Sequence, residues 1–251
     1  MACLALVCAA PPHRAEVSDE TWRRESRQWL ETLSPGAAVR VLNPLGSVHA
    51  RFGGYAGQVE VLATLQYDAA QALRPEVSVT AEDAGLAVEA HGAGSGPSVR
   101  ADLVVFVPAG VTLNVETTHD AIDAKGLKGD LNASSVAGDI TIRAVRGRVR
   151  AKTARGTLSA TLETGATDRS QAFSTETGEI EIYLWEDAEQ RVLVATSGEI
   201  GTDFSIDIEH FPGEEPGKRA VAVVGGGGPE ISLTSKRGRI RLLRLPRGLG
   251  R

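Results

Sequence analysis

Residues 120–164 consist of consecutive nine-residue units, and this repeat constrains the fold more than any other feature of the sequence. Each unit opens with a turn residue and continues with an alternating strand. Two places after each opening residue stands a large apolar side chain: Ile122, Leu131, Ile140, Val149 and Leu158. Because one such unit buries little surface alone, neighbouring units have to stack and supply one another's core.

Two further positions in each unit complete the predicted inward face. Four places after the opening residue the chain has mostly alanine, namely Ala124, Ala133, Ile142, Ala151 and Ala160. Seven places after it stand Leu127, Val136, Val145 and Ala154. Burial of each Ile or Leu contributes about 1.5–3 kcal/mol, more than an exposed ion pair. We therefore expect these rows to hold the array together.

The repeat predicts an all-β fold of the β-solenoid type. Two nine-residue sides would form one coil of about 18 residues, and coils would stack about 4.8 Å apart. The opening pattern returns at Gly178, Gly198 and Gly238. We predict one β-strand-repeat solenoid domain over residues 36–245, with insertions at 186–192 and 205–228.

The N-terminus predicts two different segments. Residues 1–15 begin with a short apolar run followed by two prolines, which is typical of a signal segment, although the basic start is missing, as in a truncated one. Cys8 is a candidate for lipidation. Over 16–35 the apolar residues fall at helical spacing, which predicts an amphipathic helix with Trp22 and Trp29 on its packed face. Residues 246–251 are a tail.

The charges of the sequence come in blocks. Residues 121–160 hold eight basic and three acidic residues, and residues 161–215 hold fourteen acidic and two basic ones. The segment after 235 is basic again. Such blocks indicate solvated faces, a charged partner or end-to-end contact between molecules. The mild net charge of -5 argues against nucleic-acid binding.

The sequence lacks the residues that most catalytic and metal-binding sites require. Both cysteines lie in the first eight residues, so no thiolate nucleophile or cysteine zinc site is available in the domain. The five histidines form no metal-ligand pair, and no Gly-x-Ser-x-Gly motif occurs. The Gly-Asp pairs at 129 and 138 do not continue into a calcium-binding repeat. We expect no catalytic residue, no metal and no cofactor.

One strand stands out as a ligand surface. Alternation over residues 178–185 places Ile180, Ile182 and Leu184 on one face and leaves a mixed aromatic and acidic set on the other. That set is Glu179, Glu181, Tyr183 and Trp185. Outward aromatic rings beside carboxylates resemble a sugar-stacking platform. Burial under one of the insertions is the alternative.

Several segments together carry a family resemblance over residues 37–245. They include the stretches at 39–48 and 105–115, the repeats that open at Gly129 and Gly138, and the closing stretch at 231–240. In their order and spacing they resemble the bacterial β-strand-repeat domain of unknown function commonly labelled "putative adhesin". The resemblance implies an exported protein of the cell envelope with a β-solenoid-like fold and no assigned catalytic residues.

These observations favour a non-enzymatic binding or structural module located outside the cytoplasm. Its ligand is unknown, and an envelope polysaccharide is the expected class. No stretch of the sequence is long and apolar enough to span a membrane. Two alternatives remain open. One is a self-assembling envelope scaffold, because exposed strand edges can pair between molecules; the other is a polysaccharide-active enzyme using two carboxylates.

Overall fold

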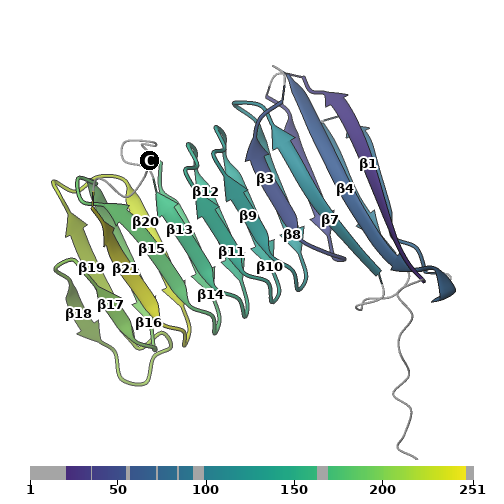
Figure 1. The fold of residues 1–251 in the computed structure, drawn as a ribbon. Coiled ribbons are helices and arrows are strands. Elements are labelled where there is room, and N and C mark those ends of the chain that lie inside the picture. Colours follow the sequence, from purple (N-terminus) through teal and green to yellow (C-terminus); the bar gives the residue numbers. More distant parts are fainter. Residues whose placement is uncertain are drawn as a thin grey trace, which may run out of the picture.

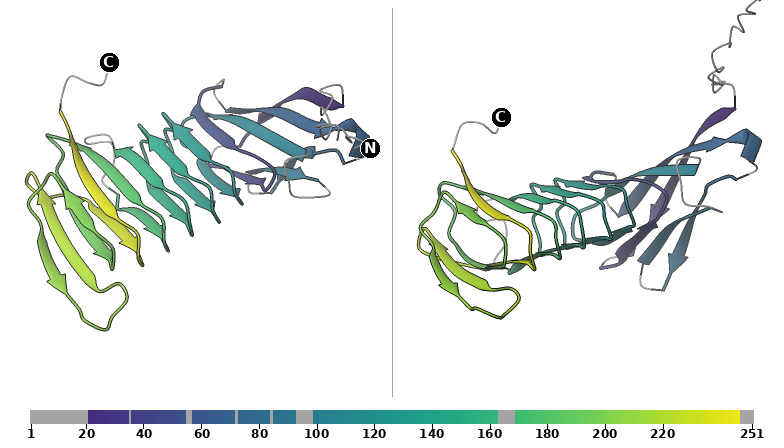
Figure 2. Two further views of the ribbon diagram at one scale, coloured as in Figure 1. Left: turned by 60° about the horizontal axis from the view of Figure 1, so that its bottom comes forward. Right: turned by 90° about the horizontal axis from the view of Figure 1, so that it is seen from below.

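Two large β-sheets face each other and enclose one continuous apolar core (Figure 1, Figure 2). This arrangement is seen in a computed structural model, which describes residues 21–246 except 35, 55–56, 72, 84, 93–98 and 163–168. The strands stack side by side along the length of the molecule. At the N-terminal end the two sheets spread apart (Figure 2).

The sheets contain all the strands of the described residues. In spatial order the 10-stranded sheet consists of β1 (Trp22–Thr32), β4 (Gln58–Asp68), β7 (Val99–Val107), β3 (Val48–Phe52), β9 (Ile122–Lys125), β11 (Ile140–Arg143), β13 (Leu158–Leu162), β15 (Ile180–Trp185), β21 (Ile240–Leu245) and β17 (Ile200–Thr202). The 11-stranded sheet consists of β18 (Asp207–His210), β19 (Lys218–Val224), β16 (Gln190–Thr196), β20 (Glu230–Ser235), β14 (Gln171–Thr175), β12 (Val149–Thr153), β10 (Leu131–Ser135), β8 (Thr112–Thr117), β2 (Ala38–Asn43), β6 (Gly85–His91) and β5 (Glu76–Glu82).

In the middle of the molecule the strands pair in parallel with a register of eighteen residues. Ile140 lies beside Ile122 on one side and beside Leu158 on the other, and Leu131 lies beside Val149. Successive nine-residue units therefore alternate between the two sheets. The five large apolar residues predicted to point inward are all at most 1% exposed. Their assignment to the core is confirmed.

Buried hydroxyl groups organise the corners that follow the strands of the 11-stranded sheet. The hydroxyl of Thr153 accepts a hydrogen bond from the backbone N–H of Gly156 and donates one to the carbonyl of Gly138, each at 3.2 Å. Ser135, Thr175 and Ser235 likewise accept from the glycine three residues later. These backbone groups are buried and would be costly to leave unpaired. A Ser or Thr three residues earlier therefore accompanies Gly138, Gly156, Gly178 and Gly238.

The corner glycines are required by close approach of backbones. A Cβ atom added at Gly147 would overlap the carbonyl group of Gly129, eighteen residues earlier, and one at Gly238 would overlap the carbonyl of Gly178. None of these four glycines has a positive φ. Absence of a side chain, rather than an unusual backbone conformation, is what the corner needs.

The true period of the repeat is eighteen residues, because its two halves differ. In the units that open at 120 and 138 the seventh-place residues Leu127 and Val145 are buried. In the unit that opens at 129 the buried position is Ser135, and Val136 is 49% exposed. The inward prediction for Val136 is therefore wrong. The side chain of Ser135 points inward at this corner, so the next side chain, that of Val136, points to solvent.

The predicted β-solenoid, a single array of repeated coils, is wrong as a description of the chain. The described residues are all-β, but they form two mixed sheets of 10 and 11 strands. Antiparallel pairs β1–β4–β7 and β5–β6 occur at one end, and β16–β19–β18 at the other. In addition β14 pairs with β20 and β15 with β21, far along the chain. The nine-residue pattern predicts only the middle strands. It does not indicate the antiparallel pairs at the two ends or the pairing of β14 with β20 and of β15 with β21.

The predicted amphipathic helix over 16–35 is also wrong. Residues 22–32 form β1, which pairs with β4 through eleven antiparallel residue pairs. Trp29 packs against the core, whereas Trp22 and Leu30 point to the outer face and are exposed. Helical spacing is a weak local preference, and pairing along the whole of β4 overrides it. The first part of this segment, 16–20, lies outside the described residues, as do the predicted signal segment 1–15 with Cys8 and the tail from 247.

The segments predicted as insertions contain strands. Segment 205–228 holds β18 and β19, which lengthen the 11-stranded sheet, and 190–192 begin β16. The chain thus leaves the stacking order after β15, adds strands at the far end and returns to pair β20 and β21 with β14 and β15.

Substitutions at two neighbouring residues of β11 test the assignment of faces. Ile140 is fully buried and Thr141 lies on the outer face. We expect Ile140→Asp to lower the free energy of unfolding by more than about 4 kcal/mol, because it buries an unpaired carboxylate, and Thr141→Asp to change it by less than about 0.5 kcal/mol. Urea unfolding followed by circular dichroism measures both. Equal losses in the two variants would contradict the assignment.

Candidate functional site

The predicted ligand surface on β15 lies on the outer face of the 10-stranded sheet. Ile180, Ile182 and Leu184 are buried, whereas Glu181, Tyr183 and Trp185 are half-buried and alternate with them. Tyr183 lies between Thr161 of β13 and Leu243 of β21, and Trp185 lies beside Leu245. The two rings therefore sit among neighbouring strands on an apolar part of the surface.

The two carboxylates of this surface are already bound. Arg241 of β21 forms an ion pair with Glu181, and its Nε lies 3.2 Å from Oε1 of Glu179. The hydroxyl of Tyr183 donates a hydrogen bond of 3.1 Å to Glu181. Both carboxylates therefore pair with Arg241 of β21, and both oxygens of Glu181 already have partners.

The same pairing explains the charge blocks of the sequence. Acidic residues of the middle segment meet basic residues of the C-terminal segment on adjacent strands and turns. The pairs are Glu176–Lys236, Glu179–Arg241, Glu181–Arg241, Glu199–Arg239 and Glu215–Arg237. The opposite charges are thus used within one chain, which removes the charge-based reason to expect end-to-end contact between molecules.

A serine, a histidine and an aspartate come together on β3 and its neighbours. Ser47 Oγ lies 3.5 Å from Nε2 of His49, and Nδ1 of His49 lies 3.7 Å from Asp123. The residue types match a catalytic triad, which the sequence analysis did not anticipate. The geometry does not match, because Ser47 donates its hydroxyl proton to Asp102 at 2.6 Å. A nucleophile needs that proton directed to the histidine.

Arginines hold the two aspartates of this cluster in their ionised form. Burial opposes ionisation of Asp102, but hydrogen bonds from Arg100 and Ser47 outweigh it and keep the pKa of Asp102 below its ordinary value. Burial likewise opposes ionisation of Asp123, and hydrogen bonds from Arg51 and Arg143 keep its pKa low. The cluster is a set of cross-strand ion pairs.

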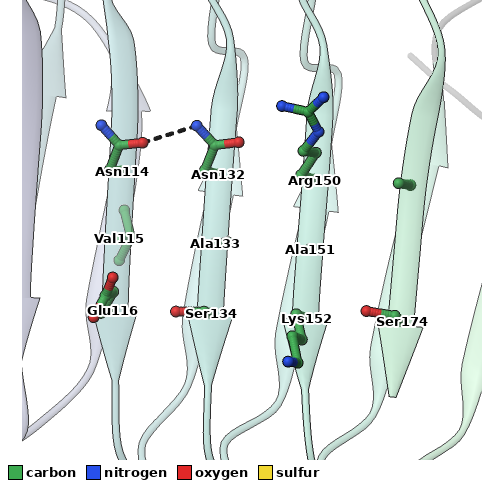
Figure 3. Close-up of a pocket in the computed structure, with 11 residues that line it drawn as sticks. Asn114, Val115, Glu116, Asn132, Ala133, Ser134, Arg150, Ala151, Lys152 and Ser174 are labelled. Atoms are coloured by element: carbon green, nitrogen blue, oxygen red, sulfur yellow. Dashed lines mark hydrogen bonds between the residues drawn. The ribbon is translucent and has the colours of Figure 1, made fainter.

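An open hollow lies on the outer face of the 11-stranded sheet, opposite to the β15 surface (Figure 3). Its volume is about 350 Å³, and it extends over β8, β10, β12 and β14. Three of its outward side chains, Ser134 of β10 and Ala172 and Ser174 of β14, are short, so the strands themselves form part of its floor. Longer polar side chains stand around them.

Two rows of side chains line this hollow, each with one residue per strand. In the first row the amide of Asn132 donates a hydrogen bond of 2.8 Å to the amide oxygen of Asn114, and Arg150 follows on the next strand. In the second row Glu116, Ser134 and Lys152 follow one another. Within the described residues Arg150 and Lys152 are exposed and have no hydrogen-bond or ion-pair partner. The hollow thus combines amide groups with two available cations.

A second hollow of about 310 Å³ adjoins the first and shares Arg150 and Ala172 with it. Arg148, Ser170 and Ser232 also line it. Together the two hollows cross the strands from β8 to β20, a distance of about 19 Å at the usual strand spacing. Arg148, Arg150 and Lys152 are consecutive outward residues around β12. Such a surface suits an extended polar ligand.

This candidate site was missed by the reasoning from sequence. The signal was present, because Asn114, Asn132 and Arg150 are each eighteen residues apart. If the eighteen-residue register is applied to the outward residues of the strands from β8 onward, these three side chains fall in one row. Attention to the aromatic residues of β15 directed the prediction to the other sheet.

Two searches of the described residues bear on metals and membranes. No group of three or more histidines, aspartates or glutamates within the described residues is arranged to hold a metal ion. The described part of the chain contains no helix with the length and apolar character of a membrane span.

The low pKa of Asp102 predicts a particular acid dependence of stability. A carboxylate whose pKa is lower in the folded state contributes stability at pH values above its unfolded pKa of about 3.9, and this contribution is lost as the pH falls through the folded pKa. We expect Asp102→Asn to be less stable than wild type at pH 6 and to lose less further stability between pH 4 and pH 2.5. Urea unfolding across this range measures the difference, and parallel curves would contradict the account.

Comparisons with known proteins give a likeness of fold. No protein-family model and no curated protein matches this sequence. A solved structure from Clostridium sporogenes, described as a "putative cell adhesion protein", superposes with a TM-score of 0.50 at 11% identity and covers 88% of this chain and 100% of its own. A "putative adhesin" from Bacteroides fragilis shows 14% identity, coverage of 88% and 97%, and a TM-score of 0.39.

A "putative lipid binding protein" from Parabacteroides distasonis is also similar, with 11% identity, coverage of 87% and 96%, and a TM-score of 0.28. At these identities the likeness concerns fold alone, and of the three structures named the one from Clostridium reaches a score that carries an argument. The expected resemblance is therefore supported only in part. The Clostridium structure, described as a "putative cell adhesion protein", shares the fold, and no family model supports the β-strand-repeat label.

Proposed function

We propose that this protein is a non-enzymatic binding module located outside the cytoplasm, which holds a polysaccharide of the cell envelope in the hollow on the 11-stranded sheet. The observation that carries the proposal is the row formed by Asn114, Asn132 and Arg150. Asn132 donates to Asn114, so the oxygen of Asn132 and the amino group of Asn114 face a ligand without an internal partner.

Sugar hydroxyl groups match these side chains chemically. A hydroxyl group donates to the oxygen of Asn132 and accepts from the amino group of Asn114, which requires both kinds of group in one place. Hydroxyls of Ser134 and Ser174 add further partners on the next row. Because the hollow is open and shallow, an extended chain fits it better than a compact molecule.

The location outside the cytoplasm is supported by the apolar start of the sequence and by the fold of the Clostridium protein described as a "putative cell adhesion protein". The non-enzymatic role is supported by the bonding of the candidate groups. Ser47 donates to Asp102, and Arg241 holds the carboxylate of Glu181. A polysaccharide-active enzyme needs a free acid and a free base beside the bond that it breaks.

The strand β15 stays a second proposed surface. Tyr183 and Trp185 are half-buried aromatic rings, and aromatic faces stack on sugars without the help of carboxylates. With Glu181 already bonded, this surface offers stacking alone. We rank it below the hollow for that reason.

Affinity electrophoresis in gels containing polygalacturonate or neutral dextran tests the proposal. We expect retardation of wild type by polygalacturonate and a weakening of about tenfold in Asn132→Ala and in Arg150→Ala, since a charge-assisted or buried polar hydrogen bond contributes about 1.5 kcal/mol. Lys125→Ala is the matched control, because it removes an exposed cation on the outer face of the other sheet.

Trp185→Ala distinguishes the two surfaces in the same gels. The hollow is supported when Asn132→Ala and Arg150→Ala weaken binding while Lys125→Ala and Trp185→Ala do not. Loss of binding in Trp185→Ala alone would move the site to β15. Cleavage of the polymer during the experiment, or no retardation by either polymer, would contradict the proposal.

A further inference from the structure

The strand β1 ends the 10-stranded sheet at the N-terminal end of the molecule (Figure 1). It pairs with β4 on one side, and no strand of the described residues pairs with its other side. With eleven residues it is much longer than the edge strands β17 and β18 at the far end, which have three and four. A long edge strand presents a row of unpaired backbone groups to another chain.

We propose that β1 is a homodimer interface in which it pairs antiparallel with β1 of a second copy of this chain. The 10-stranded sheets of the two copies would then join into one continuous sheet through a two-fold axis. This inference is independent of the proposed polysaccharide site, which lies on the other sheet.

The exposed side chains of β1 favour one register. With a two-fold axis perpendicular to the sheet, the outer faces of both copies lie on the same side, so that even-numbered residues meet even-numbered ones. When Ser26 lies on the axis, Trp22 of one copy faces Leu30 of the other. These two outer-face residues are 39% and 52% exposed in the single chain. The Trp22–Leu30 contact therefore occurs twice in the dimer and covers all four side chains.

The charged residues of β1 agree with the same register. Glu25 then faces Arg27 of the second copy, Arg23 faces the ring of Trp29, and Arg24 faces Gln28. Opposite charges and cation–aromatic pairs are favourable across strands. No pair in this register brings like charges together.

Neighbouring registers are less favourable. An axis at Glu25 would place Glu25 against itself and Arg23 against Arg27. At Arg27 the axis would oppose two arginines, and at Gln28 it would place Glu25 against Glu31. Like charges that face each other directly are destabilising. Charged residues commonly protect edge strands from pairing, but on β1 they leave the register centred on Ser26 open.

Hydrogen bonds to Glu25 hold β1 in position for pairing with a second copy. Glu25 accepts hydrogen bonds from Arg74 at 2.5 and 2.6 Å and from the hydroxyl of Tyr67 at 2.5 Å. Tyr67 is on β4, and Arg74 lies just before β5 of the 11-stranded sheet. The edge strand is therefore held in position before a second chain arrives, which lowers the entropic cost of pairing.

Sedimentation velocity of the full-length chain over a range of concentrations tests the interface. We expect wild type to form a species of twice the 26.4 kDa monomer mass. Trp22→Lys should be monomeric, since it places an ammonium group against the apolar Leu30 of the second copy. Trp22→Lys combined with Leu30→Glu should restore the dimer through two Lys–Glu pairs across the interface.

Val223→Lys is the matched control, because Val223 is 58% exposed on β19 at the far end of the molecule. It should leave the dimer intact. A monomeric wild type, a dimer that persists in Trp22→Lys, or a dimer lost equally in Val223→Lys would overturn the proposal. Failure of the double variant to restore the dimer would overturn the register centred on Ser26. Circular dichroism confirms that each variant is folded.

Discussion

Close contact between backbones at the corners is the constraint on which the rest of this structure depends. Gly147 lies against the carbonyl of Gly129, and Gly238 against that of Gly178, with no room for a side chain between them. At the corners that follow the 11-stranded sheet, hydroxyl groups such as that of Thr153 satisfy the buried backbone groups. Because the corners stack directly, the strands between them pair in register, and every side chain is aligned with its counterpart on the next strand. The apolar rows of the core and the polar rows of the outer faces both follow from this.

The middle of the fold was predictable from the sequence because its information is local. Ile122, Ile140 and Leu158 alternate with polar neighbours, and the eighteen-residue register aligns them in the core. The ends were not predictable in the same way. The segment of β1 has helical spacing, and only the partner β4, more than thirty residues later, makes it a strand. Pairing of β15 with β21 skips sixty residues and has its clearest sequence signal in the complementary charges, such as those of Glu181 and Arg241.

The candidate site shows what such alignment provides for function. Residues that are far apart in the sequence, Asn114, Asn132 and Arg150, become neighbours in a row without any dedicated loop. A rigid sheet presents them at fixed spacing, which suits recognition of a polymer with its own repeat. The opposite face uses its charges to join strands, as Asp123 does with Arg51 and Arg143. The prediction of a ligand surface on β15 weighed aromatic residues above row alignment, so the hollow on the other sheet was not anticipated.

The thermal stability of Gly147→Ala compared with Gly201→Ala tests the central constraint most directly. A methyl group at Gly147 would overlap the backbone of Gly129, whereas one at Gly201 of β17 would only touch the side chain of Arg241 at 3.6 Å. The account predicts that Gly147→Ala lowers the free energy of unfolding by about 1–3 kcal/mol, as overpacking of a rigid site does, and clearly lowers the melting temperature, while Gly201→Ala leaves both nearly unchanged. Equal melting temperatures of the two variants and wild type would contradict it.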